Sequence, residues 1–122
     1  MTLKKSENMN TIIQQFKEQF PDIFPANSGN DKYATYAVLH HYGVYCAQHF
    51  EEEKSKEILN TLNKVYQQKN LFTCNAIENE FFAALAEQLG VNDLMKHLKN
   101  IPENLWSVYI KVLIETQKNT QQ

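Results

Sequence analysis

The sequence predicts an all-α protein, either a five- to six-helix antiparallel bundle or a short α-solenoid-like array. Apolar residues recur at three- and four-residue steps along most of the 122 residues, which is typical of amphipathic helices. Runs of β-branched residues with period-two alternation, the pattern of strands, do not occur in the sequence. Gly and Pro are scarce, at three each, so few turns interrupt the helices. The length fits one helical domain, residues 1–122, with residues 1–8 and 118–122 as frayed ends.

The first two predicted helices cover residues 10–20 and 32–50. Apolar residues of the first helix share one face, and Pro21 ends it because proline disfavours helical geometry in the residue before it. Asp31 is a candidate N-cap for the second helix, which is apolar around nearly its whole circumference and is therefore expected to be central and buried. Gly43 lies in its middle, where glycine usually allows a neighbouring helix to approach closely.

Residues 53–69 and 75–89 carry the next two predicted helices. Thr73 or Asn75 is expected to cap the start of the second of these, and Gly90 to end it. A short helix follows with Asn92 as its cap, and Pro102 opens the last helix. The pattern therefore accounts for five or six helices, but it does not fix their crossing angles.

The charge pattern argues against nucleic acids and membranes as partners. All 12 basic residues are Lys, 14 residues are acidic, and the formal net charge is −2. Arg, the side chain best suited to phosphate and guanine contacts, is missing from the sequence. No segment approaches the roughly 20 apolar residues of a membrane span, and no secretory signal follows the first lysines. We therefore expect a cytoplasmic protein in which Cys46 and Cys74 are reduced and mostly buried.

One group of side chains has the composition of a metal or thiol site: His40, His41, Cys46, His49, Glu52 and Glu53. Cys46 and His49 are three residues apart, and His49 and Glu53 four, so each pair can share a helix face. Such residues ligate zinc or form a Cys/His nucleophile pair. A single helix seldom surrounds a metal, however, and the one distant histidine is His97. We favour a core helix with locally bonded histidines, and predict no metal, no cofactor and no catalytic residue.

Acidic and aromatic residues are the candidates for a partner-binding surface. The two acidic clusters suit either a solvated helix start, which complements the helix dipole, or a patch that meets a basic protein. Tyrosines of the apolar second helix are mostly core residues, but any that is left exposed would be a natural interface anchor. Phe81 and Phe82 point about 100° apart on a helix, so we expect one of them near the surface. The candidate partner-binding residues are Glu51, Glu52, Glu53, Glu78, Glu80, Tyr42 and Tyr45.

Three segments carry a resemblance to a known group of proteins: QFPDIFP at residues 19–25, NAIENEFFAAL at 75–85 and IPENLW at 101–106, with a Tyr-rich helix after the first. Together they resemble a family of small all-helical bacterial proteins that has no assigned catalytic activity. That family is similar in size and style to immunity proteins of polymorphic toxin systems, including contact-dependent inhibition. The resemblance covers residues 10–115. It implies a protein that binds its cognate toxin domain and occludes its surface.

Three functions follow, in order of preference. The first is a non-catalytic protein-binding inhibitor, an immunity protein that neutralises a toxin domain by tight binding. The second is a helical adaptor or a self-associating protein, with a homodimer built on aromatic residues of the second helix. The third is a metal- or thiol-dependent enzyme that uses Cys46 and His49.

Overall fold

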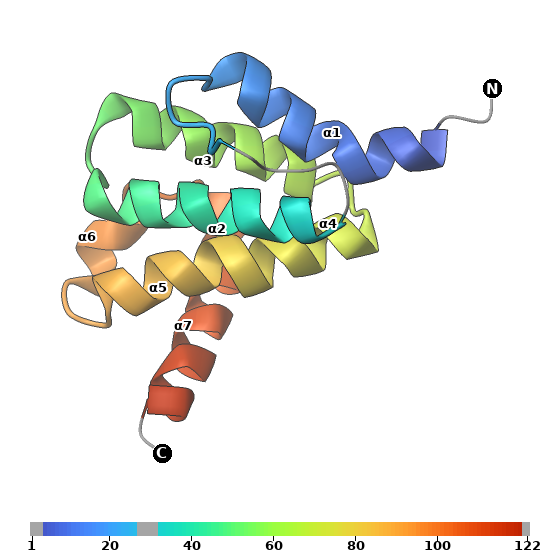
Figure 1. Ribbon diagram of the computed structural model, residues 1–122. Helices are drawn as coiled ribbons and strands as arrows, with labels where there is room; N and C mark the ends of the chain where they lie inside the picture. Colours follow the sequence, from blue (N-terminus) through green and yellow to red (C-terminus); the bar gives the residue numbers. More distant parts are fainter. Residues whose placement is uncertain (1–3, 27–31, 121–122) are drawn as a thin grey trace.

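Helices provide all the regular secondary structure in the part of the chain that the computed structural model describes, residues 4–26 and 32–120 (Figure 1). This confirms the predicted all-α class. None of the described helices combines the length and the apolar composition needed to cross a bilayer. In chain order the elements are α1 (Lys4–Gln19), α2 (Lys32–Gln48), α3 (Glu53–Tyr66), α4 (Leu71–Ala76), the π-helical turn η1 (Ile77–Phe82), α5 (Ala83–Leu89), α6 (Leu94–Leu98), the 3₁₀ turn η2 (Glu103–Leu105) and α7 (Trp106–Thr120).

The segment α4–η1–α5 is one continuous helix with a π turn in its middle. Ile77 and Ala83, at the two junctions, keep right-handed helical dihedral angles. This helix corresponds to the one predicted over residues 75–89, but it begins four residues earlier. Its N-cap is Asn70, whose side-chain oxygen accepts a hydrogen bond from the backbone N–H of Thr73 at 2.9 Å. The predicted caps Thr73 and Asn75 are therefore wrong, and six helices form the described fold.

Several helix ends differ from the predicted ones. Residues 4–8, expected to be frayed, belong to α1, and α7 continues to Thr120. Gly90 follows α5 with a positive φ of 69°, which glycine adopts without steric cost, and its backbone N–H donates to the carbonyl oxygen of Ala86, so the predicted helix end is confirmed. Asp93 rather than Asn92 precedes α6, and no side chain caps it. The predicted N-cap Asp31 lies outside the described residues.

The fold is arranged around α2, which contacts α1, α3, α4, η1 and α5. Consecutive helices α2, α3 and α4 alternate in direction, whereas α1 runs parallel to α2 (Figure 1). Helix α7 crosses the others steeply and packs against η1 and α5. Because several helices surround one central helix, instead of each contacting only its chain neighbours, the arrangement corresponds to the bundle among the two predicted architectures.

Gly43 lies where α2 meets η1 and α5. A Cβ atom at this position would lie 2.6 Å from the carbonyl oxygen of Phe81 and 3.1 Å from the Cβ of Ala84. The first distance is shorter than a van der Waals contact, and the atom opposite is backbone, which moves less readily than a flexible side chain. The absence of a side chain at Gly43 therefore permits this close approach, which confirms the prediction made for it.

Both Phe81 and Phe82 are fully buried, which corrects the expectation that one of them lies near the surface. The cause is that η1 packs against two helices, α2 and α7, and not against one. The ring of Phe82 lies 5.9 Å from that of Tyr109 on α7. The rings of Phe81 and Phe82 also lie 5.4 Å apart in an edge-to-face contact, and both belong to the core.

We predict that Gly43→Ala destabilises the protein. Overpacking of a core costs about 1–3 kcal/mol, and the better helix propensity of alanine returns only about 1 kcal/mol. A net loss of up to about 2 kcal/mol in the free energy of unfolding is expected, measured by urea denaturation. Ser107→Ala, at an exposed position of α7, serves as the control and should change it by no more than about 0.5 kcal/mol. A Gly43→Ala variant more stable than the wild type would contradict the close approach.

Candidate functional site

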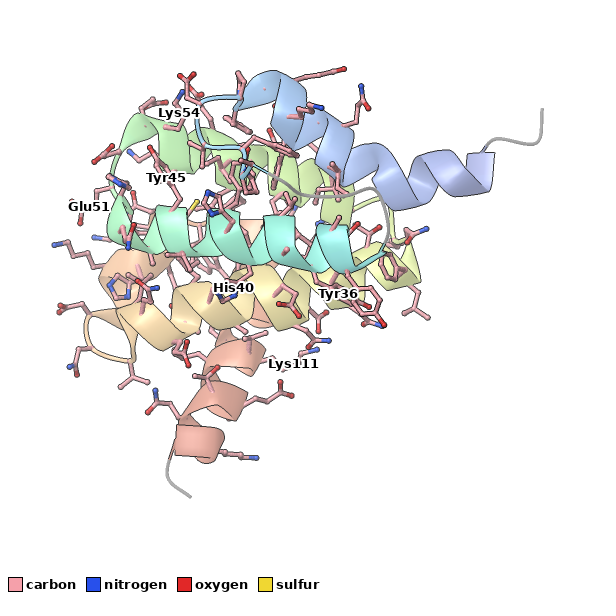
Figure 2. All side chains as sticks on the ribbon, in the orientation of Figure 1. Tyr36, His40, Tyr45, Glu51, Lys54 and Lys111 are labelled. Carbon is pink, nitrogen blue, oxygen red and sulfur yellow. The ribbon has the colours of Figure 1, made fainter. Side chains whose placement is uncertain are left out.

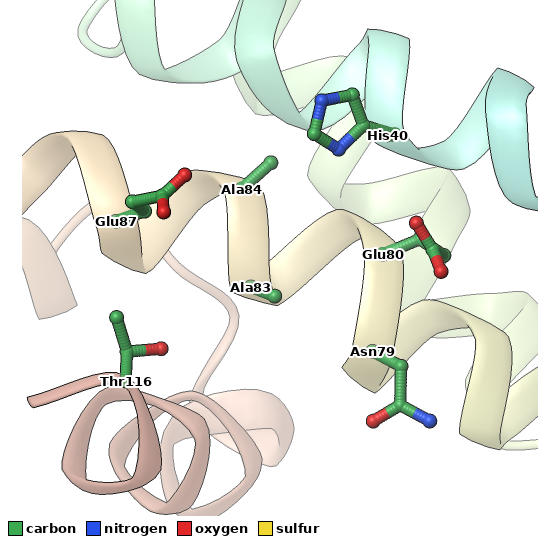
Figure 3. Close-up of a pocket in the computed structure, with 7 residues that line it drawn as sticks. All are labelled: His40, Asn79, Glu80, Ala83, Ala84, Glu87 and Thr116. Carbon is green, nitrogen blue, oxygen red and sulfur yellow. The ribbon is translucent and has the colours of Figure 1, made fainter. Parts of the chain in front are cut away.

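An open groove of about 480 Å³ lies at the junction of α2, η1, α5 and α7. Its lining side chains come from all four elements, as Figure 3 shows: His40, Asn79, Glu80, Ala83, Ala84, Glu87 and Thr116. We call this set the acidic groove, after its two glutamates. It is adjacent to the Gly43 contact, because Ala84 takes part in both.

One face of the continuous helix provides most of the acidic groove. Its five lining positions follow steps of one, three, one and three residues, which place side chains on the same side of a helix. Ala83 and Ala84 lie between Glu80 and Glu87 and leave a shallow floor (Figure 3). His40 of α2 faces this floor from one side, and Thr116 of α7 lies on the other.

The two carboxylates of the acidic groove are available to a partner. Glu87 is exposed and Glu80 is half-buried. Among the described side chains, neither carboxylate forms a salt bridge. Lys111, a cation on α7, is bound by Glu78 instead, at 2.8 Å. The acidic groove therefore presents negative charge that no described side chain neutralises through a salt bridge.

The carboxylate of Glu78, two residues before Glu80, is occupied by contacts within the protein. It accepts hydrogen bonds from the Tyr66 hydroxyl at 2.6 Å and from the Lys111 ammonium at 2.8 Å. These contacts join η1 to α3 and α7. Burial raises the pKa of Glu78, but the hydrogen bonds from Lys111 and Tyr66 outweigh it, so the pKa lies below its ordinary value. Glu78 therefore stabilises the packing of three helices, and this is a different role from the predicted partner contact.

The cluster Glu51 to Glu53 lies at the connection between α2 and α3, where all three side chains are exposed. Glu51 pairs with Lys96 of α6 at 3.3 Å, and Glu52 pairs with His49 at 2.9 Å. This end of α2 is about 12 Å along the helix axis from His40, since eight residues separate Gln48 from His40 (Figure 2). The structure therefore does not join this cluster to the acidic groove.

The two candidate tyrosines have different environments. Tyr42 is fully buried, and its hydroxyl donates to the carbonyl oxygens of Phe16 at 3.3 Å and Phe20 at 2.9 Å. It thereby satisfies carbonyl groups at the end of α1, so the expectation that it contacts a partner is wrong. Burial also raises the pKa of Tyr42. Tyr45 is half-buried and stacks on the ring of His49, with the centroids 4.4 Å apart.

The residues with the composition of a metal or thiol site, which we do not favour as one, do not converge. Cys46 is fully buried, and burial raises the pKa of its thiol to about 12. His49 bonds to Glu52 and stacks on Tyr45 instead of meeting Cys46. His41 donates from Nε2 to the carbonyl oxygen of Ile23 at 2.8 Å. Within the part of the chain that the structure describes, no group of three or more His, Cys, Asp or Glu side chains is placed to hold a metal ion.

Sequence reasoning missed Asn79, Ala83, Ala84, Glu87 and Thr116. The first four lie with Glu80 on one face of a predicted helix, so their spacing was visible in the sequence. That spacing did not show that the face stays open, because only the packing of α2 and α7 on either side decides this. The sequence makes His40 a candidate metal ligand, but its place on the acidic groove depends on the same packing.

We predict that Glu78→Gln destabilises the protein near pH 7 by about 1–2 kcal/mol. Hydrogen bonds to charged groups are worth about 1.5–3 kcal/mol, and the exposure of the Lys111 side chain to solvent reduces this value. Glu80→Gln is the matched control, since its carboxylate forms no salt bridge among the described side chains, and its effect should stay within about 0.5 kcal/mol. Chemical denaturation of both variants beside the wild type measures the difference. Equal losses of unfolding free energy in the two variants would contradict the structural role of Glu78.

The advantage of the wild type over Glu78→Gln also depends on pH. Because the pKa of Glu78 is lower in the folded than in the unfolded state, its stabilisation is complete above the ordinary carboxyl pKa of 4.5. The stabilisation is lost as the pH falls through the folded-state pKa. Denaturation midpoints of the two proteins should therefore approach each other as the pH is lowered from 6 towards 3. A difference that stays constant over this range would contradict the lowered pKa.

Comparison with known proteins gives one family match. A family model described as a domain of unknown function, DUF7674, matches residues 13–117. The searches of the curated proteins and of the solved structures each found no match. The matched region includes the acidic groove and the Glu78 contacts, while the likeness to immunity proteins stays a prediction. Because the match spans most of the chain, the protein belongs to the DUF7674 family of all-helical domains.

Proposed function

We propose that this protein is a non-catalytic protein-binding inhibitor, an immunity protein that neutralises a cognate bacterial toxin domain by tight binding in the cytoplasm. The acidic groove is the observation that carries the proposal. It is open, it has a shallow floor, and Glu80 and Glu87 present charge that the described side chains do not neutralise. A surface of this kind suits a basic protein, since charge complementarity speeds association and fixes orientation.

Occlusion requires a rigid surface more than it requires reactive groups. The acidic groove is held rigid by its neighbours, because Ala84 packs beside Gly43 and the Glu78 contacts join η1 to α3 and α7. A preorganised surface loses little conformational entropy when a partner binds. The formal net charge is only −2, so the acidic character that we assign to the binding surface is local.

The first experiment captures the partner from bacterial cells that produce the protein, with mass spectrometry of what co-purifies. We expect one protein at near-equal stoichiometry. Its C-terminal domain should stop growth when it is expressed alone, and co-expression of this chain should restore growth. A captured protein that is harmless when expressed alone would contradict the immunity function, as would capture of nothing.

A pair of double variants then tests the surface against that partner. Glu80→Lys/Glu87→Lys should weaken binding at least tenfold, a loss of about 1.4 kcal/mol, in a calorimetric titration. Glu57→Lys/Glu103→Lys makes the same change in net charge at exposed sites on α3 and η2 and should bind as the wild type does. Glu78 stays unchanged, because its internal hydrogen bonds would make a loss of binding ambiguous.

Self-association is a second candidate, and two exposed apolar side chains favour it. Leu71 at the start of α4 is 75% exposed, and Tyr33 at the start of α2 is 67% exposed. Tyr33 belongs to an aromatic cluster, because the ring of Tyr36 lies 6.2 Å from Tyr33 and 5.8 Å from Phe72, and Leu71 directly precedes Phe72 in the chain. Apolar surface of this kind is typical of protein interfaces.

This candidate predicts a homodimer at micromolar concentration in sedimentation velocity. Leu71→Lys should shift the protein to monomer, because it places a charge in the proposed interface. Met95→Lys is the control, since Met95 is 73% exposed on α6 at another place in the fold. A wild type that sediments as a monomer at all concentrations tested would rule out the homodimer.

A further inference from the structure

The separation of the two carboxylates in the acidic groove sets what can bind there. Glu80 and Glu87 are seven residues apart on the continuous helix, which corresponds to about 10 Å along its axis. In Figure 3 they flank Ala83 and Ala84 and do not point at a common centre. They therefore suit two separate cationic groups better than one ion that both would ligate.

The floor between the carboxylates suits the close approach of a second helix. Ala83 is half-buried and Ala84 is buried, and neither extends beyond a methyl group. Small side chains of this kind let another backbone come near. His40 and Thr116 bound the floor on the α2 and α7 sides, so the opening runs along α5 between them.

We propose that the acidic groove binds a basic amphipathic helix of the partner protein, and that two Lys or Arg side chains seven residues apart on that helix pair with Glu80 and Glu87. Positions i and i+7 of a helix lie on one face and about 10 Å apart along its axis, which matches the spacing of Glu80 and Glu87 along their own helix. Side chains between them on the same face, at i+3 and i+4, rest on Ala83 and Ala84. The inference rests on the proposed function and names the chemistry of the partner segment.

Charge decides against a nucleic acid at this place. Phosphate groups would meet two carboxylates, and like charges in contact are repulsive. Lys111, a cation on α7, is held by Glu78 and so does not offset them. Arg has an advantage over Lys in the partner, because its guanidinium group binds a carboxylate through two parallel hydrogen bonds.

A titration followed by ¹H–¹⁵N NMR tests the proposal without knowledge of the natural partner. The probe is a 16-residue, acetylated and amidated Ala/Gln helical peptide with two Arg residues seven positions apart. The matched peptide has the same composition but its two Arg residues only two positions apart, on different faces of the helix. We expect the first peptide to shift the amide signals of Asn79, Glu80, Ala83, Ala84, Glu87 and Thr116, and to bind at least fivefold more tightly than the second.

Two variants of the protein complete the design. Glu80→Gln/Glu87→Gln should lower the affinity for the first peptide at least fivefold. Glu57→Gln/Glu103→Gln loses the same charge elsewhere on the surface and should bind this peptide as the wild type does. Raising the salt concentration from about 0.05 to 0.3 M should also lower the affinity of the wild type for the first peptide, because salt screens the charges of these solvent-accessible carboxylates. Equal binding of the two peptides, or shifts at another surface, would overturn the inference.

The outcome is separable from that of the proposed function. Capture of a toxin domain that binds the Glu80→Lys/Glu87→Lys variant normally would leave the immunity function standing and overturn the basic-helix site. Specific binding of the first peptide, together with capture of a partner that is not toxic, would support the site and overturn the immunity function.

Discussion

The close contact between Gly43 and the backbone of Phe81 is the constraint on which the rest of the structure depends. The carbonyl oxygen of Phe81 lies 2.6 Å from the position that a Cβ of residue 43 would take, so α2 can approach the π turn this closely only because the residue is glycine. This approach leaves η1 between α2 and α7, and it buries both phenylalanines of that turn. Ala84 lies in the same contact and also forms the floor of the acidic groove. The packing that stabilises the core therefore also shapes the candidate site.

Glu78 and Glu80 show how the π turn separates the roles of neighbouring residues. Glu78 accepts hydrogen bonds from α3 and α7 and fixes three elements together, while Glu80 lies at the acidic groove beside α2. In the sequence both belong to one acidic cluster that spans three residues, 78–80. π turns occur frequently at functional sites, because the local change in helix geometry re-aims side chains. Here one carboxylate supports the surface that the other presents.

The site could be predicted only in part, and particular residues show why. Glu80 was recognised from its charge, and the polar and small face that includes Glu87 could be read from helical spacing. The frequency of tyrosine at interfaces makes Tyr42 a candidate partner contact, yet its hydroxyl donates to carbonyl groups at the end of α1. Those carbonyls lie more than twenty residues away in the chain, and no local pattern indicates which side chain will reach them. The same holds for the Glu78 carboxylate and Lys111.

The sequence by itself determined the all-α class, the positions of most helices, the central place of α2 and the close contact at Gly43. These features depend on local periodicity and on the properties of single residues, which are present in the unfolded chain. Only the tertiary structure decided the parallel direction of α1, the burial of both Phe81 and Phe82 and the open face between α2 and α7. Each of these depends on which helix surfaces meet, and that choice is made by packing between residues far apart in the chain, where helical periodicity carries no information.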